Sequence, residues 1–278
     1  MKTPSKTTLK KLPEVWGLLS LIKCEFLKLK RKKIIYIIIL SAILFPSATA
    51  LLLLSRRASD SPAQLYDELY INSIGTGIQF LLPIVISILA TILFFTERDN
   101  DTFKALRTIP VTSRQLVLTK ITVLFLSSTL FALVTHLLSL VLGSIFFSYN
   151  ESPEYILITI ANGIFIACGT LPLIILNVTF SRTYVFSILM TVFYTVLSFF
   201  LVALSPFLPK TVFRFVPITS TTLWTAGVLG KIGKLSLEMY EANLRAAIPS
   251  TLNISIYMAL IGTVSIIIIV KLYERWES

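Results

Sequence analysis

The chain has 278 residues, of which 55% are apolar, and its mean hydropathy is +0.84. It holds 25 lysines and arginines against 14 aspartates and glutamates, which gives a formal net charge of +11. Apolar runs long enough to cross a bilayer exclude an ordinary soluble domain and indicate an integral membrane protein. On a soluble chain the charge would suggest nucleic acid. Here anionic membrane lipid explains it, so no nucleic acid partner is expected.

Residues 1–33 are predicted to form a cytoplasmic, amphipathic segment at the membrane interface. Apolar residues recur at intervals of three and four, namely Leu12, Val15, Trp16, Leu19, Ile22, Phe26 and Leu29. The charged residues Lys11, Glu14, Lys23, Glu25 and Lys28 fall off this stripe, and a basic run follows at 30–33. This pattern predicts a helix that lies flat on the inner surface. It is either an elbow helix that braces the bundle and frames a lateral opening, or a simple membrane anchor.

Six apolar stretches follow, each close to the length of about 20 residues that a helix needs to span a bilayer. They cover residues 34–54, 74–95, 121–146, 156–178, 184–204 and 252–270, and none contains a charged residue. The fold class is therefore an all-α integral membrane protein with six transmembrane helices, and residues 34–278 form one transmembrane domain. Pro83 and Pro172 fall within spans, where they are expected to bend the helix.

The distribution of basic residues predicts the orientation. If the amino terminus is cytoplasmic, 18 of the 25 lysines and arginines lie on the cytoplasmic side. Basic residues are retained in the cytoplasm, so both termini are predicted to be cytoplasmic and the protein to be a multi-pass protein of the plasma membrane. The longest outer segment, 205–251, contains four prolines and an apolar run at 223–229. It is expected to form short re-entrant helices before the last span.

The sequence offers no catalytic, cofactor-binding or metal-binding motif. Cys24 and Cys168 lie at different levels, which excludes a disulfide between them, and no zinc spacing is present. The glycine- and lysine-rich stretch 227–234 lacks the spacing of a phosphate-binding loop. A lipid-modifying membrane enzyme would need clustered histidine and acidic residues. We therefore expect no enzymatic activity in this chain.

A few polar residues lie inside the predicted spans, and each is a functional candidate by default. Gln79, His136 and Asn162 are candidates for the lining of a translocation path. The alternative is that these residues, with Asn177, form hydrogen bonds between helices, and His136 has no predicted carboxylate partner. Scarce charges within the spans argue against a secondary transporter or channel, whereas a purely structural membrane subunit remains open.

The cytoplasmic loop 96–120 reads TERDNDTFKALRTIPVTSRQLVLTK. Acidic residues open it, a short helical piece covers about 102–106, and Pro110 breaks that piece before Arg114. Acidic residues at a helix start complement the helix dipole. The loop is therefore predicted to contain a short amphipathic helix, held parallel to the membrane by the flanking spans.

This loop resembles the first cytoplasmic loop of the permeases of type-2 ABC exporters. The matching positions are Glu97, Thr102, Leu106, Pro110, Ser113, Arg114 and Lys120, while Asp101 stands where that class often has glycine. The resemblance implies a coupling helix that rests in a cleft of an ATP-binding subunit. Its contact residues would be Glu97, Asp101, Thr102, Leu106, Arg107, Pro110 and Arg114.

The resemblance also implies the partners and the cargo. Two copies of an ATP-binding subunit would bind ATP and Mg, this chain would hold no cofactor, and a second permease copy would complete a homodimer or a heterodimer. The opening IKCEFLKLKRKK, residues 22–33, is similar to bacterial cell-membrane permeases that export bacitracin, lantibiotics or phenol-soluble modulins. It implies a hydrophobic or amphipathic toxin or antimicrobial peptide as cargo. Drugs, lipids and glycans remain alternatives.

Overall fold

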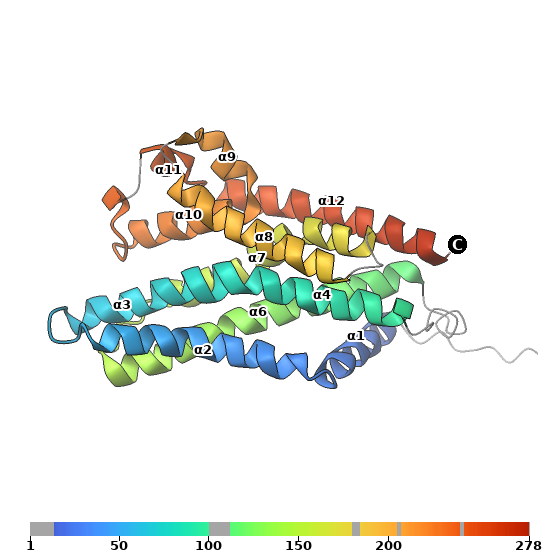
Figure 1. Ribbon diagram of the computed structural model, residues 1–278, viewed down its shortest axis with the longest axis horizontal. Helices are drawn as coiled ribbons and strands as arrows, with labels where there is room; N and C mark the ends of the chain where they lie inside the picture. The colour runs from blue at the N-terminus through green and yellow to red at the C-terminus, as the bar shows by residue number, and fades with distance from the viewer. Residues whose placement is uncertain (1–13, 100–111, 180–183, 205–206, 240–241, 278) are drawn as a thin grey trace, which may run out of the picture.

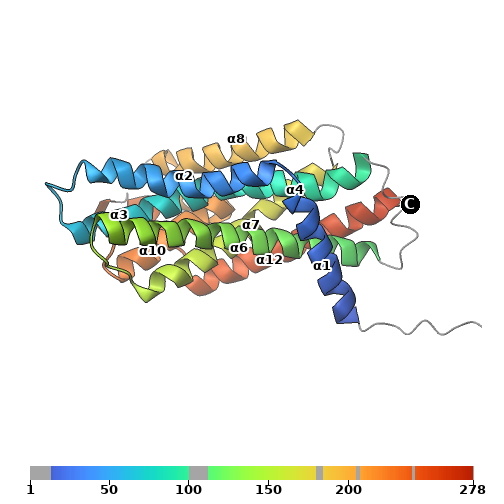
Figure 2. The same ribbon diagram turned by 90° about the horizontal axis from the view of Figure 1, so that it is seen from below.

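A computed structural model describes residues 14–99, 112–179, 184–204, 207–239 and 242–277. Within these ranges the regular structure is helical throughout. The long helices run nearly parallel in an elongated bundle, and α1 (Glu14–Lys30) leaves it at a steep angle (Figures 1 and 2). We call the end of the bundle with α1 and the end of α12 the α1 end, and the opposite end, with α9 and α11, the α9 end.

The remaining elements follow in chain order. They are α2 (Ile34–Leu54), α3 (Pro62–Asn72), the π-helix η1 (Ser73–Leu81), α4 (Leu82–Asp99), α6 (Ser113–Phe146), α7 (Pro153–Thr179), α8 (Tyr184–Ala203), α9 (Lys210–Phe215), α10 (Pro217–Lys231), the 3₁₀ helix η3 (Leu237–Met239), α11 (Ala242–Ala247) and α12 (Thr251–Glu277). The two cysteines are free, as predicted.

Five helical stretches among the described residues are long and apolar enough to cross a membrane. They are Ile34–Leu54, Pro62–Phe94, Ser113–Phe146, Pro153–Leu176 and Thr251–Arg275, and they correspond to five of the six predicted spans. The fifth predicted span falls on α8. Its described apolar part, Ile188–Val202, is shorter than the other five, so the sixth crossing stays a prediction.

The helical column that contains the second predicted span begins at Pro62 and not at residue 74, so most of the segment 55–73, predicted to lie outside, is helical. Ser61 caps α3 by accepting a hydrogen bond from the Gln64 backbone N–H at 3.3 Å, and proline is favourable in the first helical turn. Leu65, Tyr66, Leu69 and Tyr70 of α3 are buried on one face. Because α3 also carries polar residues, its hydropathy alone did not indicate a buried helix.

The π-helix η1 joins α3 to α4 in one continuous column. Pro83, the second residue of α4, has no backbone N–H, so an α-helical bond to the Gln79 carbonyl cannot form. A Cβ atom on Gly77 would lie 3.0 Å from Cγ2 of Thr135. This close approach of η1 to α6 positions Gln79 inside the bundle.

The bundle is buried at its centre and apolar on its outer faces. The column α3–η1–α4 and helix α7 pack against most of the other helices. Large apolar side chains on α2, α6, α8 and α12 are exposed, among them Leu52, Leu130, Phe193 and Leu260. A single soluble molecule would rarely expose so many, whereas a lipid bilayer accommodates them.

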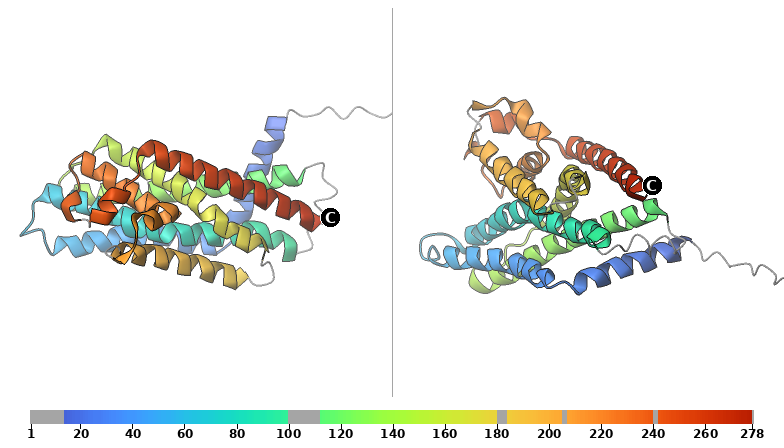
Figure 3. Two further views of the ribbon diagram at one scale, coloured as in Figure 1. Left: turned by 90° about the horizontal axis from the view of Figure 1, so that it is seen from above. Right: turned by 45° about the vertical axis from the view of Figure 1, so that its right-hand side comes forward.

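Short helices form between α8 and α12, as the prolines and the apolar run predicted. Helices α9, α10 and α11 gather on one side of the bundle, away from α2 (Figure 3). Phe213, Leu223, Leu244 and Ala247 form a small core there. Helix α10 also contacts α7 and η1, so this region continues the bundle core.

Candidate functional site

Most of the predicted coupling residues lie outside the described residues. These are Asp101, Thr102, Leu106, Arg107 and Pro110. Glu97 belongs to α4, but its side chain is not described. The coupling role of these residues stays a prediction.

The structure describes where the chain leaves this loop. Thr112 and Gln115 form a reciprocal cap at the start of α6. The Gln115 backbone N–H donates to Oγ1 of Thr112 at 3.3 Å, and the Thr112 backbone N–H donates to Oε1 of Gln115 at 3.0 Å. In the same turn Nε of Arg114 donates to Oε1 of Glu274 on α12 at 3.0 Å. The exit of the loop is thereby tied to the last helix.

A buried charge cluster joins α1, α4 and α6 near the α1 end. Lys120 is fully buried, and its Nζ donates to the Leu93 carbonyl at 2.6 Å and to Oε2 of Glu25 at 3.4 Å. Lys28 donates to the other carboxylate oxygen of Glu25 at 2.6 Å. Glu25, which falls off the apolar stripe of α1, is nevertheless buried. The reason is that Lys120 provides a partner inside the bundle.

Lys120 was one of the positions that match the type-2 exporter loop. Its position in α6, with no solvent-exposed surface, means that it cannot contact a partner subunit in this conformation. Instead it fixes α1 to α4 and α6, the two helices that flank the loop 96–120. Of the apolar stripe of α1, Leu19 is 58% exposed, while Leu29 is buried against the bundle.

A second polar cluster lies in the middle of the bundle and unites two of the predicted path residues. Nε2 of Gln79 donates to Oδ1 of Asn162 at 3.2 Å and to Oγ1 of Thr225 at 3.1 Å. Nδ2 of Asn162 donates to the Ile158 carbonyl at 2.9 Å. These bonds connect η1, α7 and α10, in agreement with the helix-packing alternative. Thr225 was not predicted, because it lies in the segment assigned to the outer loop.

Gln79 also borders a hollow of about 320 Å³ between η1, α8 and α10. Phe80, Phe199 and Phe200 supply aromatic walls, and Thr195 and Ser198 add hydroxyl groups. Asn162 is fully buried and does not reach this hollow. A mostly apolar hollow with a few polar groups suits a hydrophobic ligand.

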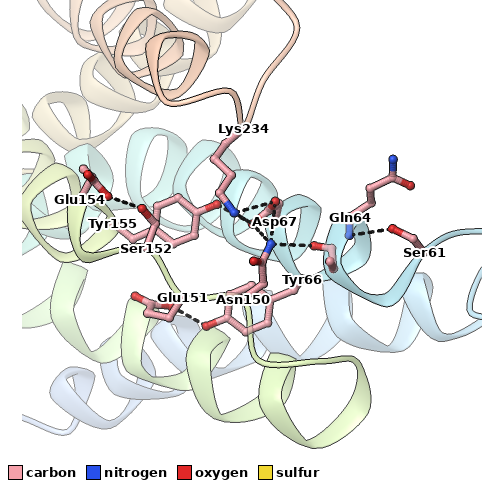
Figure 4. A network of polar contacts seen from close by, with 11 residues as sticks. Ser61, Gln64, Tyr66, Asp67, Asn150, Glu151, Ser152, Glu154, Tyr155 and Lys234 are labelled. Atoms are coloured by element: carbon pink, nitrogen blue, oxygen red, sulfur yellow. Dashed lines mark hydrogen bonds and ion pairs between the residues drawn. The ribbon is translucent and has the colours of Figure 1, made fainter.

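A third cluster lies at the α9 end and centres on Asp67 of α3 (Figure 4). Nζ of Lys234 lies 3.1 Å from both carboxylate oxygens of Asp67. The Tyr155 hydroxyl donates to Oδ1 at 2.6 Å, and Nδ2 of Asn150 donates to Oδ2 at 3.0 Å. Residues from three separate parts of the chain thus meet at one carboxylate.

Glu151 extends this cluster to His136. The Tyr66 hydroxyl donates to Oε2 of Glu151 at 2.5 Å, and Nε2 of His136 lies 3.3 Å from Oε1. The prediction that His136 lacks a carboxylate partner is therefore wrong. Glu151 lies in the loop before α7, outside every apolar run, so a search within the spans could not find it. His136 stands apart from Gln79 and Asn162, and the three do not line one path in this conformation.

Tyr70 connects the two halves of the α9-end cluster. Its hydroxyl donates to the Tyr155 carbonyl at 2.7 Å, and its ring stacks on that of Tyr155 at a centroid distance of 3.8 Å. The rings of Tyr70 and His136 form a T-shaped pair with centroids 5.4 Å apart. Outside this cluster, Arg56 lies in the turn between α2 and α3. Its hydrogen bond to Glu68, and to a smaller extent that to Asp60, raises the pKa of its guanidinium group.

None of these clusters has the composition of a catalytic or metal centre. No group of three histidine, cysteine or acidic side chains suited to a metal ion occurs in the part of the chain that the structure describes. The carboxylates named above are engaged by lysine, arginine, histidine, tyrosine or asparagine. What the clusters do is hold together helices that are distant in sequence.

The comparison with known families identifies the class of protein. Residues 21–198 match the family described as "ABC-2 family transporter protein". The chain belongs to the ABC-2 transporter family. This permease is thus a multi-pass membrane protein of the type-2 ABC class, and its match runs from α1 into α8. No curated protein matches its sequence.

Proposed function

We propose that this permease is the membrane subunit of an ABC exporter that moves hydrophobic or amphipathic peptides out of the cell. A separate ATP-binding subunit, present in two copies, binds ATP and Mg and drives the transport. Two permease copies, identical or different, form the membrane part. As in permeases that export bacitracin, lantibiotics or phenol-soluble modulins, the cargo is a toxin or an antimicrobial peptide.

The observation that carries this proposal is the bracing of the loop between α4 and α6. On one side Lys120 binds the Leu93 carbonyl of α4 and Glu25 of α1. On the other side Arg114 binds Glu274 of α12. A displacement of this loop would therefore move α1, α4, α6 and α12 together, because these contacts hold the four helices to one another.

The distribution of basic residues supports a cytoplasmic position for the α1 end. Helix α1 then acts as the elbow helix, α8 as the sixth span, and α9 to α11 as re-entrant helices at the outer face. ATP binding changes the population of inward and outward states only through the different affinities of the partner subunit for them. The hollow beside Gln79 and Phe199 is the best candidate for cargo contact, because it is the described hollow that borders a predicted path residue.

The test is ATPase activity of the permease reconstituted with its ATP-binding partner. Arg107→Glu is expected to abolish the stimulation of hydrolysis by amphipathic peptide and to weaken co-purification of the partner. Arg57→Glu is the matched control, because Arg57 is an exposed cation just after the last residue of α2, at the end of the bundle opposite to the loop between α4 and α6. Unchanged hydrolysis and co-purification in Arg107→Glu would overturn the coupling role. Stimulation by lipid or glycan, but not by peptide, would overturn the cargo assignment.

A further inference from the structure

An apolar groove of about 370 Å³ opens between α1, α2, α4 and α6. Its walls include Phe26, Ile38, Leu89 and Phe131, and Ser127 and Lys30 are the polar residues that border it. An engineered cavity of about 150 Å³ already binds benzene. The groove is large enough for a hydrocarbon group of considerable length.

The position of the groove matches one leaflet of a bilayer. Along α2 it extends from Ile35 to Ala42, a rise of about 10 Å, and it reaches the middle of α6 at Val134. Ile39 and Leu130, which line it, are 50% and 58% exposed. The groove is therefore open to the surrounding lipid and begins at the α1 end.

Basic residues gather at its mouth. Lys30 lines the groove, and Arg31, Lys32 and Lys33 are exposed in the turn that follows. None of these four takes part in an ion pair among the described residues, whereas the nearby Glu25 binds Lys28 and Lys120. The mouth therefore has an excess of positive charge beside a hydrocarbon-lined groove.

We propose that the groove binds an acyl chain of an anionic phospholipid, whose phosphate lies against Lys30 and the adjacent basic turn. The charge of the mouth selects this occupant. A second copy of the chain docked symmetrically would bring another basic cluster against the first, and a cationic peptide would be repelled for the same reason. The site is separate from the hollow beside Gln79, and it requires neither cargo nor the ATP-binding subunit.

Native mass spectrometry of the purified full chain in detergent tests the proposal. The probes are palmitoyl-oleoyl phosphatidylglycerol and the matching phosphatidylcholine. Lys30→Gln is expected to weaken phosphatidylglycerol binding about fivefold, which corresponds to about 1 kcal/mol per membrane-surface cation, and to leave phosphatidylcholine unchanged. Lys271→Gln removes an exposed cation from the same end of the bundle but away from the groove, and should change neither.

Filling the groove tests the acyl-chain contact separately. Ile39→Trp should reduce binding of both lipids at least fivefold, whereas Ile37→Trp, an exposed α2 position outside the groove, should not. Leu130→Trp, with Leu126→Trp as its control, tests the same contact from α6. This second pair of variants decides the question if Ile39→Trp does not fold.

Three results would overturn the proposal. Equal losses in Lys30→Gln and Lys271→Gln would show that the charge effect is not local to the groove. Full lipid binding in a folded Ile39→Trp or Leu130→Trp would show that the groove is not occupied by lipid. Loss of a dimer in these variants, with lipid binding retained, would assign the groove to a second copy and would also overturn the proposal.

Discussion

The buried cluster at the α1 end makes the sharpest stability prediction. In Glu25→Gln the carboxylate charge that faces Lys120 at 3.4 Å and Lys28 at 2.6 Å is removed with almost no change in volume. Hydrogen bonds to charged groups contribute about 1.5–3 kcal/mol, and losing one partner of a buried pair is costly. Lys120 keeps the Leu93 carbonyl, so we expect a loss of about 2 kcal/mol in the free energy of unfolding.

For a chain of this size such a loss corresponds to a decrease in melting temperature of about 4–8 °C. Thermal unfolding of the purified permease in detergent, followed by tryptophan fluorescence, measures it. Glu68→Gln is the control, since Glu68 binds Arg56 at 2.7 Å but both side chains are exposed. Its melting temperature should stay within the error of the wild type. If both variants shift equally, or Glu25→Gln does not shift, the cluster is not a stabilising contact.

Three further predictions use the same unfolding measurement. Asp67→Asn, which weakens contacts to Lys234 and Tyr155, should cost about 1–2 kcal/mol. The cost should be smaller when Lys234→Met is already present, because that variant has already lost the contact between Asp67 and Lys234. Gln79→Leu should cost about 1 kcal/mol, within the range for hydrogen bonds between membrane helices. An unchanged free energy of unfolding would show that the hydrogen bonds of the Gln79 amide do not stabilise the bundle. Gly143→Ala should cost about 1–3 kcal/mol, because its Cβ would lie 2.7 Å from the Tyr66 ring. The control Gly75→Ala, whose Cβ would have nothing within 4 Å, should not destabilise the protein. Equal effects of the two variants would contradict this packing.

Hydropathy predicted the spanning helices well because their length is fixed by the bilayer. The predicted stretch 34–54 coincides with α2, and the helices that contain four of the other predicted spans extend beyond the apolar run at one or both ends. Helix α6 begins at Ser113 although the apolar run begins at residue 121. The cap at Thr112 and the buried Lys120 allow the helix to begin before the apolar run. A hydropathy profile detects neither feature.

The polar contacts could not be predicted in the same way, because they depend on which helices become neighbours. Asp67 and Lys234 are separated by 167 residues, and His136 meets a glutamate from the following loop. Asp67, Glu151 and Lys234 each resemble an ordinary loop or interface residue in the sequence. Gln79, His136, Asn162 and Asn177 were marked in advance as polar residues within spans, but the partners of their side chains could not be predicted.

The two ends of the bundle are held by contacts of different strength, which bears on the direction of transport in the proposed function. At the α1 end the side chains of Lys120 and Glu25 are 0% and 5% exposed, whereas at the α9 end those of Lys234 and Asp67 are 19% and 16% exposed. Water screens the second pair more strongly, so separating it costs less. In the proposed function, the buried Lys120–Glu25 pair therefore holds α1 and α6 together when the loop is pushed, and the Lys234–Asp67 pair separates at lower cost. Under that proposal the helices open at the α9 end, which is the arrangement that export requires.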